Sequence, residues 1–183
     1  MFSTKKIKDR MTLGIVSGLL GNLAKQSTAS ILIRVLKIGK SDGPTYAAGI
    51  FMPKSTMFFK KKAKSVQIIG HVADNIIGAM LGVSAVYLLS FTGKDHYVTK
   101  GIGLGHLSWT TMYGFLAKMG ATSMYPVGAK NTINSLISHS VFGVVTKYAA
   151  VKLGDEGLFK PNFQSLGKPQ QEILQPRKPN PPS

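Results

Sequence analysis

VQIIGHVADNIIGAMLGVSAVYLLSF, residues 66–91, is a run of 26 residues in which His71 and Asp74 are the only charged or imidazole side chains. The hydrocarbon core of a bilayer is about 30 Å thick and an α-helix rises about 1.5 Å per residue, so about 20 apolar residues are enough to cross it. This stretch therefore predicts a membrane-spanning helix, around which the other segments can be placed.

Small residues line one face of the predicted helix, because Gly70, Asp74, Gly78 and Gly82 recur at every fourth position. Glycines at this spacing let a neighbouring helix approach closely. A carboxylate on the same face has to turn toward protein or water, since a charge facing lipid is costly. The pattern predicts a packed helix bundle with Asp74 in its interior.

The segment before it, residues 12–36, is amphipathic and is interrupted by Lys25, Gln26 and Arg34. It either crosses the membrane with its polar face turned into a bundle or lies at the membrane interface. Residues 101–119 form the third predicted span, with Gly101 and Gly105 as packing positions.

Residues 132–153 form the fourth predicted span, in which Ser135, His139, Gly143 and Lys147 recur at every fourth position. Each of the four spans thus combines a small-residue face with a polar group. We therefore expect an all-α fold, an integral membrane bundle of four transmembrane helices within residues 1–155.

The connections are polar and basic. Gly43, Pro44 and Pro53 argue against a continuous helix through residues 37–65, although the apolar segment 46–53 could lie against the membrane. The end of this connection is predicted to bind the lipid surface through four lysines next to two phenylalanines: Lys60, Lys61, Lys62 and Lys64. Residues 92–100 predict a tight turn, and residues 156–183 predict a disordered, basic, proline-rich tail.

The charge balance is strongly basic, with 23 Lys and Arg against 7 Asp and Glu. In a chain with membrane spans, this excess favours anionic lipid headgroups or an acidic partner over nucleic acid. No cysteine is present, which excludes disulfides, thiolate metal sites and cysteine nucleophiles. No cofactor is expected. A homo-oligomer is a possible partner, since four short helices enclose little aqueous volume alone.

Several residues between positions 66 and 150 give the chain a family resemblance. The residues that carry it are His71 with Gly78, Gly82 and Tyr87, then TGKD at 92–95, Lys100, Gly101 and Trp109, and finally Ser135, His139 and Gly143. In these residues the chain resembles small four-helix bacterial inner-membrane proteins of the YagU or YqhR kind. The resemblance implies a multi-pass protein of the bacterial cytoplasmic membrane, and it implies no activity.

The candidate site is an intramembrane polar cluster of Lys25, His71, Asp74 and His139. If all four segments cross, these residues lie roughly 8 to 17 Å below the same membrane surface at the rise of an α-helix, so they can meet. Three interpretations stay open: a structural pair in which Lys25 neutralises Asp74, a proton relay or ion site, and a metal site using His71, Asp74 and His139.

The sequence contains no nucleotide-binding loop and no catalytic motif. The glycines at 101, 103 and 105 follow no strand, and Ser135 and His139 have no elbow turn or acidic partner in the sequence. We therefore expect a non-enzymatic membrane protein whose basic loops bind anionic lipid or an acidic partner. The alternative is a small transport or ion-conducting subunit that acts as an oligomer.

The topology is not decided by the charge distribution, because nine Lys and Arg near the membrane fall on each predicted side. Four spans with both termini in the cytoplasm are favoured here. A three-span arrangement, with residues 12–36 at the interface, would remove Lys25 from its partners in the bundle.

Overall fold

The computed structural model describes residues 6–39, 43–53, 55–57, 63–120 and 128–159. Within these ranges every regular element is helical, apart from one isolated parallel bridge between Ile7 and Gly154. The elements are α1 (Arg10–Arg34), α2 (Gly43–Phe51), α4 (Lys64–Thr92), α5 (Tyr97–Trp109), the π-helix η1 (Thr110–Leu116), α6 (Ala129–Leu153) and the 3₁₀-helix η2 (Glu156–Phe159). The predicted all-α class is confirmed.

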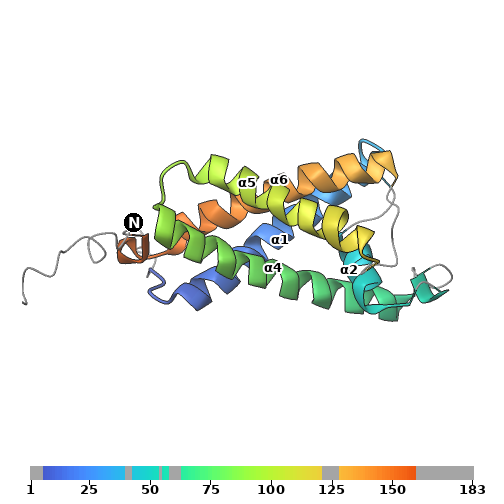
Figure 1. The fold of residues 1–183 in the computed structure, drawn as a ribbon, viewed down its shortest axis with the longest axis horizontal. Helices are drawn as coiled ribbons and strands as arrows, with labels where there is room; N and C mark the ends of the chain where they lie inside the picture. The colour runs from blue at the N-terminus through green and yellow to red at the C-terminus, as the bar shows by residue number, and fades with distance from the viewer. Residues whose placement is uncertain (1–5, 40–42, 54, 58–62, 121–127, 160–183) are drawn as a thin grey trace, which may run out of the picture.

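The four long segments α1, α4, α5–η1 and α6 run side by side along the long axis of the molecule (Figure 1). Extensive contacts join α4 to α1, α1 to α6, and α6 to α5, whereas α4 and α5 touch only slightly. Although α4 and α5 follow each other along the chain, they are the two helices between which the bundle is incompletely closed.

Only one helix in the described part of the chain is long and apolar enough to cross a membrane by length and composition, namely α4, in which a stretch of 18 residues has a mean hydropathy of 1.7. The α5 helix has 13 residues before it changes to the wider π-helix, and α1 carries Lys25 in its interior. The four-helix architecture is therefore observed, while the crossing of a membrane by all four helices remains a proposal.

Close glycine contacts explain how α1 and α4 pack together. A Cβ atom built on Gly82 would lie 2.2 Å from the Gly14 carbonyl oxygen, and one on Gly18 would lie 2.3 Å from the Gly78 carbonyl oxygen. These distances leave no room for a side chain, so the backbones of the two helices pack directly against each other.

Close glycine contacts also join α5 to α6, since a Cβ on Gly105 would lie 2.1 Å from the His139 carbonyl oxygen. On Gly143 a Cβ would overlap the Gly101 carbonyl oxygen in the same way. Gly70 packs instead against α2, where a Cβ would lie 2.2 Å from the Pro44 carbonyl oxygen. All six glycines expected at helix interfaces lie at helix contacts.

The apolar middle of the connection before α4, residues 46–53, is buried in its first part, whereas Ile50 and Phe51 are exposed. Tyr46, Ala47 and Ala48 belong to α2 and are buried in the protein, because Gly70 allows this short helix to pack on the first part of α4. Lys64 is exposed at the start of α4. The other three lysines of the predicted lipid-binding cluster, Lys60, Lys61 and Lys62, lie outside the described residues.

The boundary predicted for the disordered tail is wrong at its beginning. Residues 156–159 form η2, and Leu158 and Phe159 are buried in an apolar cluster with Leu13, Val86 and Leu89. Hydrogen bonds of the Ile7 backbone to Leu153 and Asp155 hold the two ends of the described chain together. Residues 160–183 of the predicted tail lie outside the described residues.

The turn predicted at residues 92–100 is shorter than expected, because α5 begins at Tyr97. Lys100 reaches back and donates hydrogen bonds to the carbonyl oxygens of Thr92 and Gly93, each at 2.9 Å. These carbonyls end α4, where a helix lacks intrahelical donors and a cation is favourable. Lys100 therefore fixes the reversal between α4 and α5.

Candidate functional site

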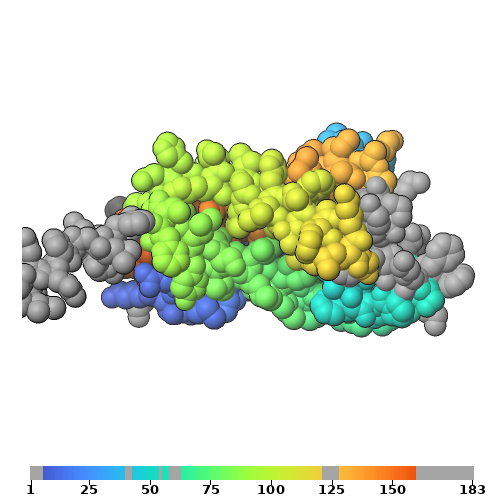
Figure 2. Space-filling view, viewed as in Figure 1, coloured from blue at the N-terminus to red at the C-terminus, as the bar shows by residue number. Residues whose placement is uncertain are grey.

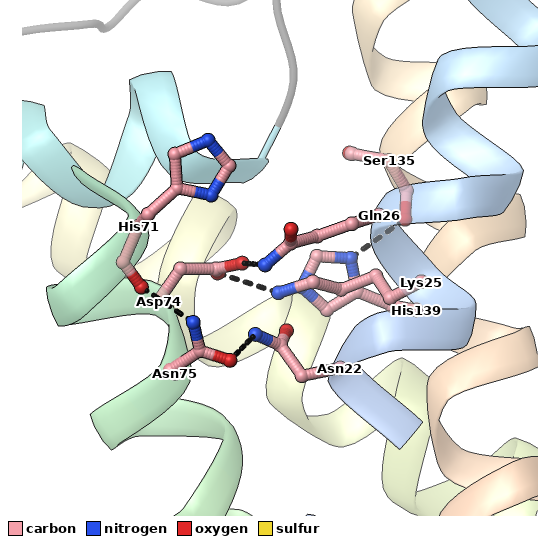
Figure 3. A network of polar contacts seen from close by, with 8 residues as sticks. All are labelled: Asn22, Lys25, Gln26, His71, Asp74, Asn75, Ser135 and His139. Atoms are coloured by element: carbon pink, nitrogen blue, oxygen red, sulfur yellow. Dashed lines mark hydrogen bonds and ion pairs between the residues drawn. The ribbon is translucent and has the colours of Figure 1, made fainter. Parts of the chain in front are cut away.

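A buried ion pair joins α1 to α4. The Nζ atom of Lys25 lies 2.6 Å from Oδ1 of Asp74, and the two residues are only 6% and 4% exposed. Gln26 donates to the other carboxylate oxygen, Oδ2, at 3.0 Å. Both oxygens of Asp74 thus have a hydrogen-bond donor, as a buried carboxylate requires. Figure 3 shows this network between the two helices.

One turn away, the same pair of helices is joined by two amides. Asn22 Nδ2 donates to Asn75 Oδ1 at 3.0 Å, and Asn75 Nδ2 donates to the carbonyl oxygen of His71 at 2.9 Å. Gly78 leaves the space that Asn22 fills, since a Cβ on Gly78 would lie 2.9 Å from the Asn22 Cβ. The glycine face of α4 therefore contacts both the backbone of α1 and the polar side chain of Asn22.

His139 of α6 lies beside the ion pair but does not bond to it. Its Nδ1 atom is 2.7 Å from the Ser135 carbonyl oxygen, and its ring meets the Tyr113 ring edge to face at 5.5 Å. Because a carbonyl oxygen can only accept, Nδ1 carries the hydrogen in this contact. Nε2 is then left as an acceptor in the interior of the bundle.

His71 does not belong to the cluster, contrary to the sequence-based prediction. Its side chain is exposed and lies away from the Lys25–Asp74 contact (Figure 3). The structure thus brings together three of the four predicted residues. Without His71, the proposed set of metal ligands is broken, and the described residues contain no group of three His, Cys, Asp or Glu side chains that could hold a metal ion.

The ion pair lies at the bottom of a cleft between α4 and η1. The cleft contains a cavity of about 50 Å³. A single water occupies about 10–15 Å³ on this measure, so the cavity has room for a few waters or a small chemical group. Its residues come from α1, α2, α4, η1 and α6 and include Lys25, Asp74, Tyr46, Tyr113, His139 and Phe142.

A furrow separates α4 from α5 on the molecular surface, and atoms of α6 are visible at its floor (Figure 2). This is the incompletely closed side of the bundle. A second cavity of about 10 Å³ adjoins the first, and polar side chains such as Gln26, Asn134 and Ser138 line it. The polar site in the interior is thus open toward the side of the bundle between α4 and α5–η1, where apolar side chains line the cleft.

Sequence reasoning missed the aromatic wall of this cleft. Tyr113 meets Tyr46 edge to face at 5.1 Å and stacks on Trp109 at 6.4 Å. Trp109 is anchored by a 2.7 Å hydrogen bond from Nε1 to Ser135 Oγ. The sequence could have indicated this wall, because Trp109 and Tyr113 are four residues apart and therefore lie on one face of a helix. The π-helix that turns Tyr113 into the cleft has no comparable signature in the sequence.

A serine–histidine contact occurs elsewhere, between Ser140 Oγ and His106 Nε2 at 3.0 Å. It lies on the exposed part of the α5–α6 contact, and among the described residues no carboxylate bonds to His106. Ser135 contacts His139 through its backbone carbonyl rather than its hydroxyl. In the part of the chain that the structure describes, neither contact includes a carboxylate bonded to the histidine, which would orient a catalytic imidazole.

No protein-family model, curated protein or solved structure matches this chain. The resemblance to YagU-like and YqhR-like membrane proteins therefore stays a prediction.

Proposed function

We propose that this chain is a non-enzymatic, multi-pass protein of the cytoplasmic membrane whose basic loops at one end of the bundle bind anionic lipid headgroups. One observation carries the proposal: the interior of the bundle holds many polar side chains beside its apolar core, and many large apolar side chains lie on the outer surface. The buried polar residues of the long helices are Ser17, Asn22, Lys25, Asp74, Ser90, Ser108, Asn134, Ser135, Ser138, His139, Thr146 and Lys147.

Large apolar side chains are frequent on the outer surface. Exposed apolar residues occur on every long helix, for example Leu23 at 63%, Met80 at 66%, Leu107 at 66% and Ile133 at 50%. Water disfavours this much apolar surface, whereas lipid accommodates it. Lipid also disfavours charges at the surface of a helix, which explains why Lys25 and Asp74 turn inward.

The lipid-binding part of the proposal concerns the end of the bundle where α1 ends and α4 and α6 begin. The described residues of this end carry Arg34, Lys37, Lys64, Lys118 and Lys130 and include no carboxylate. At the opposite end, Asp9, Asp95, Asp155 and Glu156 accompany the lysines. Anionic headgroups would supply counter-charge to these lysines and arginine, worth about 1 kcal/mol for each such residue near a membrane surface.

Membrane insertion is tested by extraction of isolated membranes. The protein should stay with the membrane in alkaline carbonate and dissolve only in detergent. Release of most of the protein by carbonate would contradict the proposal. Reporter fusions at the two termini then test the four-span topology, for which both should give cytoplasmic signals.

Lipid binding is tested by the melting temperature of purified protein in bilayer discs of phosphatidylglycerol or phosphatidylcholine. Phosphatidylglycerol should raise the melting temperature, and less so in Lys64→Gln/Lys118→Gln/Lys130→Gln. The matched control is Lys6→Gln/Lys94→Gln/Lys152→Gln, at the end that carries acidic residues. An equal response of both variants and the unchanged protein would argue against a lipid site at the first end.

A second candidate function is a small ion- or proton-conducting subunit. The observation that favours it is the Lys25–Asp74 pair beside His139 in a cavity large enough for a few waters. Titratable groups inside a membrane often belong to ion pathways. Proteoliposomes with a pH-sensitive dye test this candidate: conduction predicts a proton flux that Asp74→Asn abolishes, and an unchanged dye signal relative to empty liposomes counts against it.

A further inference from the structure

The Lys25 ammonium group keeps hydrogen-bonding capacity that the described residues do not use. Its three N–H groups make one hydrogen bond there, to Asp74 Oδ1. The ammonium lies 5.9 Å from the centre of the Phe142 ring, and both residues line the cleft. A hydrogen-bond acceptor that entered the cleft would therefore find a donor at its floor.

The walls above this donor are apolar. Ile77 and Leu81 of α4 stand on one side, and Met112 and Leu116 of η1 stand on the other. Since α4 makes few contacts with α5 and η1, the cleft between α4 and η1 faces the surroundings of the protein. In a membrane, those surroundings are lipid chains.

We propose that this cleft binds a lipid-soluble molecule with a single apolar chain and a neutral carbonyl head, whose carbonyl oxygen accepts a hydrogen bond from Lys25. This proposal rests on the membrane insertion proposed above. The chain lies between Leu81 and Met112, and the head enters the cavity beside Tyr113.

The charge of the site selects a neutral head. Lys25 and Asp74 already neutralise each other at 2.6 Å. A carboxylate head would bring a second negative charge next to Asp74, and a cationic head would compete with Lys25. Either leaves a net charge in a place of low dielectric, which a neutral carbonyl avoids.

The volume also limits the head. A cavity of about 50 Å³ is smaller than the cavity of about 150 Å³ that holds a benzene ring in an engineered protein. An ester or ketone group attached to a narrow chain fits this limit, whereas a bulky ring does not. The π-helix η1 on one wall of the cleft also favours a binding site here, because π-helical turns occur frequently at functional sites.

The fluorescence of Trp109, the only tryptophan of the chain, can be used to detect a molecule in the cleft. Trp109 stacks on Tyr113, which lines the cavity, so a brominated molecule in the cleft should quench its fluorescence at short range. The full-length protein in bilayer discs of unbrominated phosphatidylcholine would be titrated with the methyl ester of dibromostearic acid. The comparison probe is dibromo-octadecane, which has the apolar chain without the carbonyl.

We expect saturable quenching by the ester, at a concentration several-fold lower than the alkane requires. Leu81→Phe/Met112→Phe fills the cleft and should abolish saturation. The matched control Leu88→Phe/Met80→Phe places the same exchanges on exposed positions of α4 and should leave it intact. Lys25→Met/Asp74→Leu removes the donor without leaving a lone charge, and it should make the ester and the alkane equivalent.

Quenching that rises linearly with either probe and is the same in all variants would overturn the proposal, because it would reflect partitioning into the bilayer. Saturation that survives in the cleft-filled variant would also overturn it. Saturable binding of dibromostearic acid in preference to its ester would refute the neutral head. Incorporation of each variant into the discs is measured in parallel, so a failure of membrane insertion is recognised separately from a failure of ligand binding.

Discussion

Gly82 of α4 lies so close to Gly18 of α1 that a Cβ atom added to Gly82 would stand 2.5 Å from the Gly18 Cα atom. Real Cβ atoms do not approach another carbon this closely, so α1 and α4 have to separate when Gly82 is replaced. The contact is also one turn from the Asn22–Gly78 packing and holds the helices that carry Lys25 and Asp74.

Gly82→Ala should therefore destabilise the bundle by about 1–3 kcal/mol, the usual cost of overpacking a close contact. The matched change Gly103→Ala should be neutral or stabilise by up to about 1 kcal/mol, because no atom lies within 4 Å of the new Cβ and alanine favours helix. Unfolding by a denaturing detergent in mixed micelles measures both free energies. Equal effects of the two changes would argue against direct backbone packing.

The Lys25–Asp74 pair should show strong non-additivity. Lys25→Leu or Asp74→Leu leaves one buried charge and should cost about 3–5 kcal/mol, whereas the double replacement should be close to neutral. Thermal unfolding of the four proteins in the same detergent measures the coupling energy. A double variant no more stable than the single variants would mean that the two side chains contribute independently.

Lys147 should be replaceable with a gain in stability. Its side chain is fully buried, and its Nζ atom has no hydrogen-bond partner among the described residues. Lys147→Met keeps the apolar stem and removes the unsatisfied donor, so the free energy of unfolding should rise by about 1–3 kcal/mol.

The control for this change is Lys152→Met, at an exposed position five residues later on α6, which should change the free energy of unfolding by much less. Both variants are compared by thermal unfolding at neutral pH. A clear loss of stability in Lys147→Met would show that the ammonium group has a partner that stabilises it.

Asp9 should contribute a pH-dependent part of the stability. Its side chain accepts a hydrogen bond of 2.6 Å from the Thr12 backbone N–H at the start of α1, and this bond lowers the pKa of the Asp9 carboxyl below its ordinary value. Because the pKa is lower in the folded state, the contribution is present above the unfolded-state pKa and is lost as pH falls through the folded-state pKa.

Asp9→Asn retains an N-cap acceptor without a titrating group. Its melting temperature should therefore fall less steeply than that of the unchanged protein over the acid range where carboxylates titrate. The difference between the two curves isolates Asp9 from Glu156, whose pKa is lowered by Lys94 in both proteins. Parallel curves for the two proteins would contradict a titrating N-cap.

The sequence by itself determined the helices and their packing faces. Periodicity and apolar length placed four helices close to the observed α1, α4, α5–η1 and α6, because these properties depend on neighbouring residues. The spacing of glycines at every fourth position predicted the helix contacts of Gly82 and Gly105, since residues at this spacing lie on one face of a helix. The number of residues between each side chain and the predicted membrane surface placed Lys25 at a similar depth to Asp74, and the two form an ion pair in the structure.

Only the tertiary structure decided which polar groups share the interior. His71 is three residues before Asp74 and lies near the same face, yet the packing of α2 on Gly70 and of α1 on Gly78 leaves His71 outside. The burial of Phe159 and the cleft between α4 and η1 likewise depend on contacts between residues far apart in the chain. Local patterns fix the faces of a helix, whereas the packing of all the helices together decides which part of each face is covered.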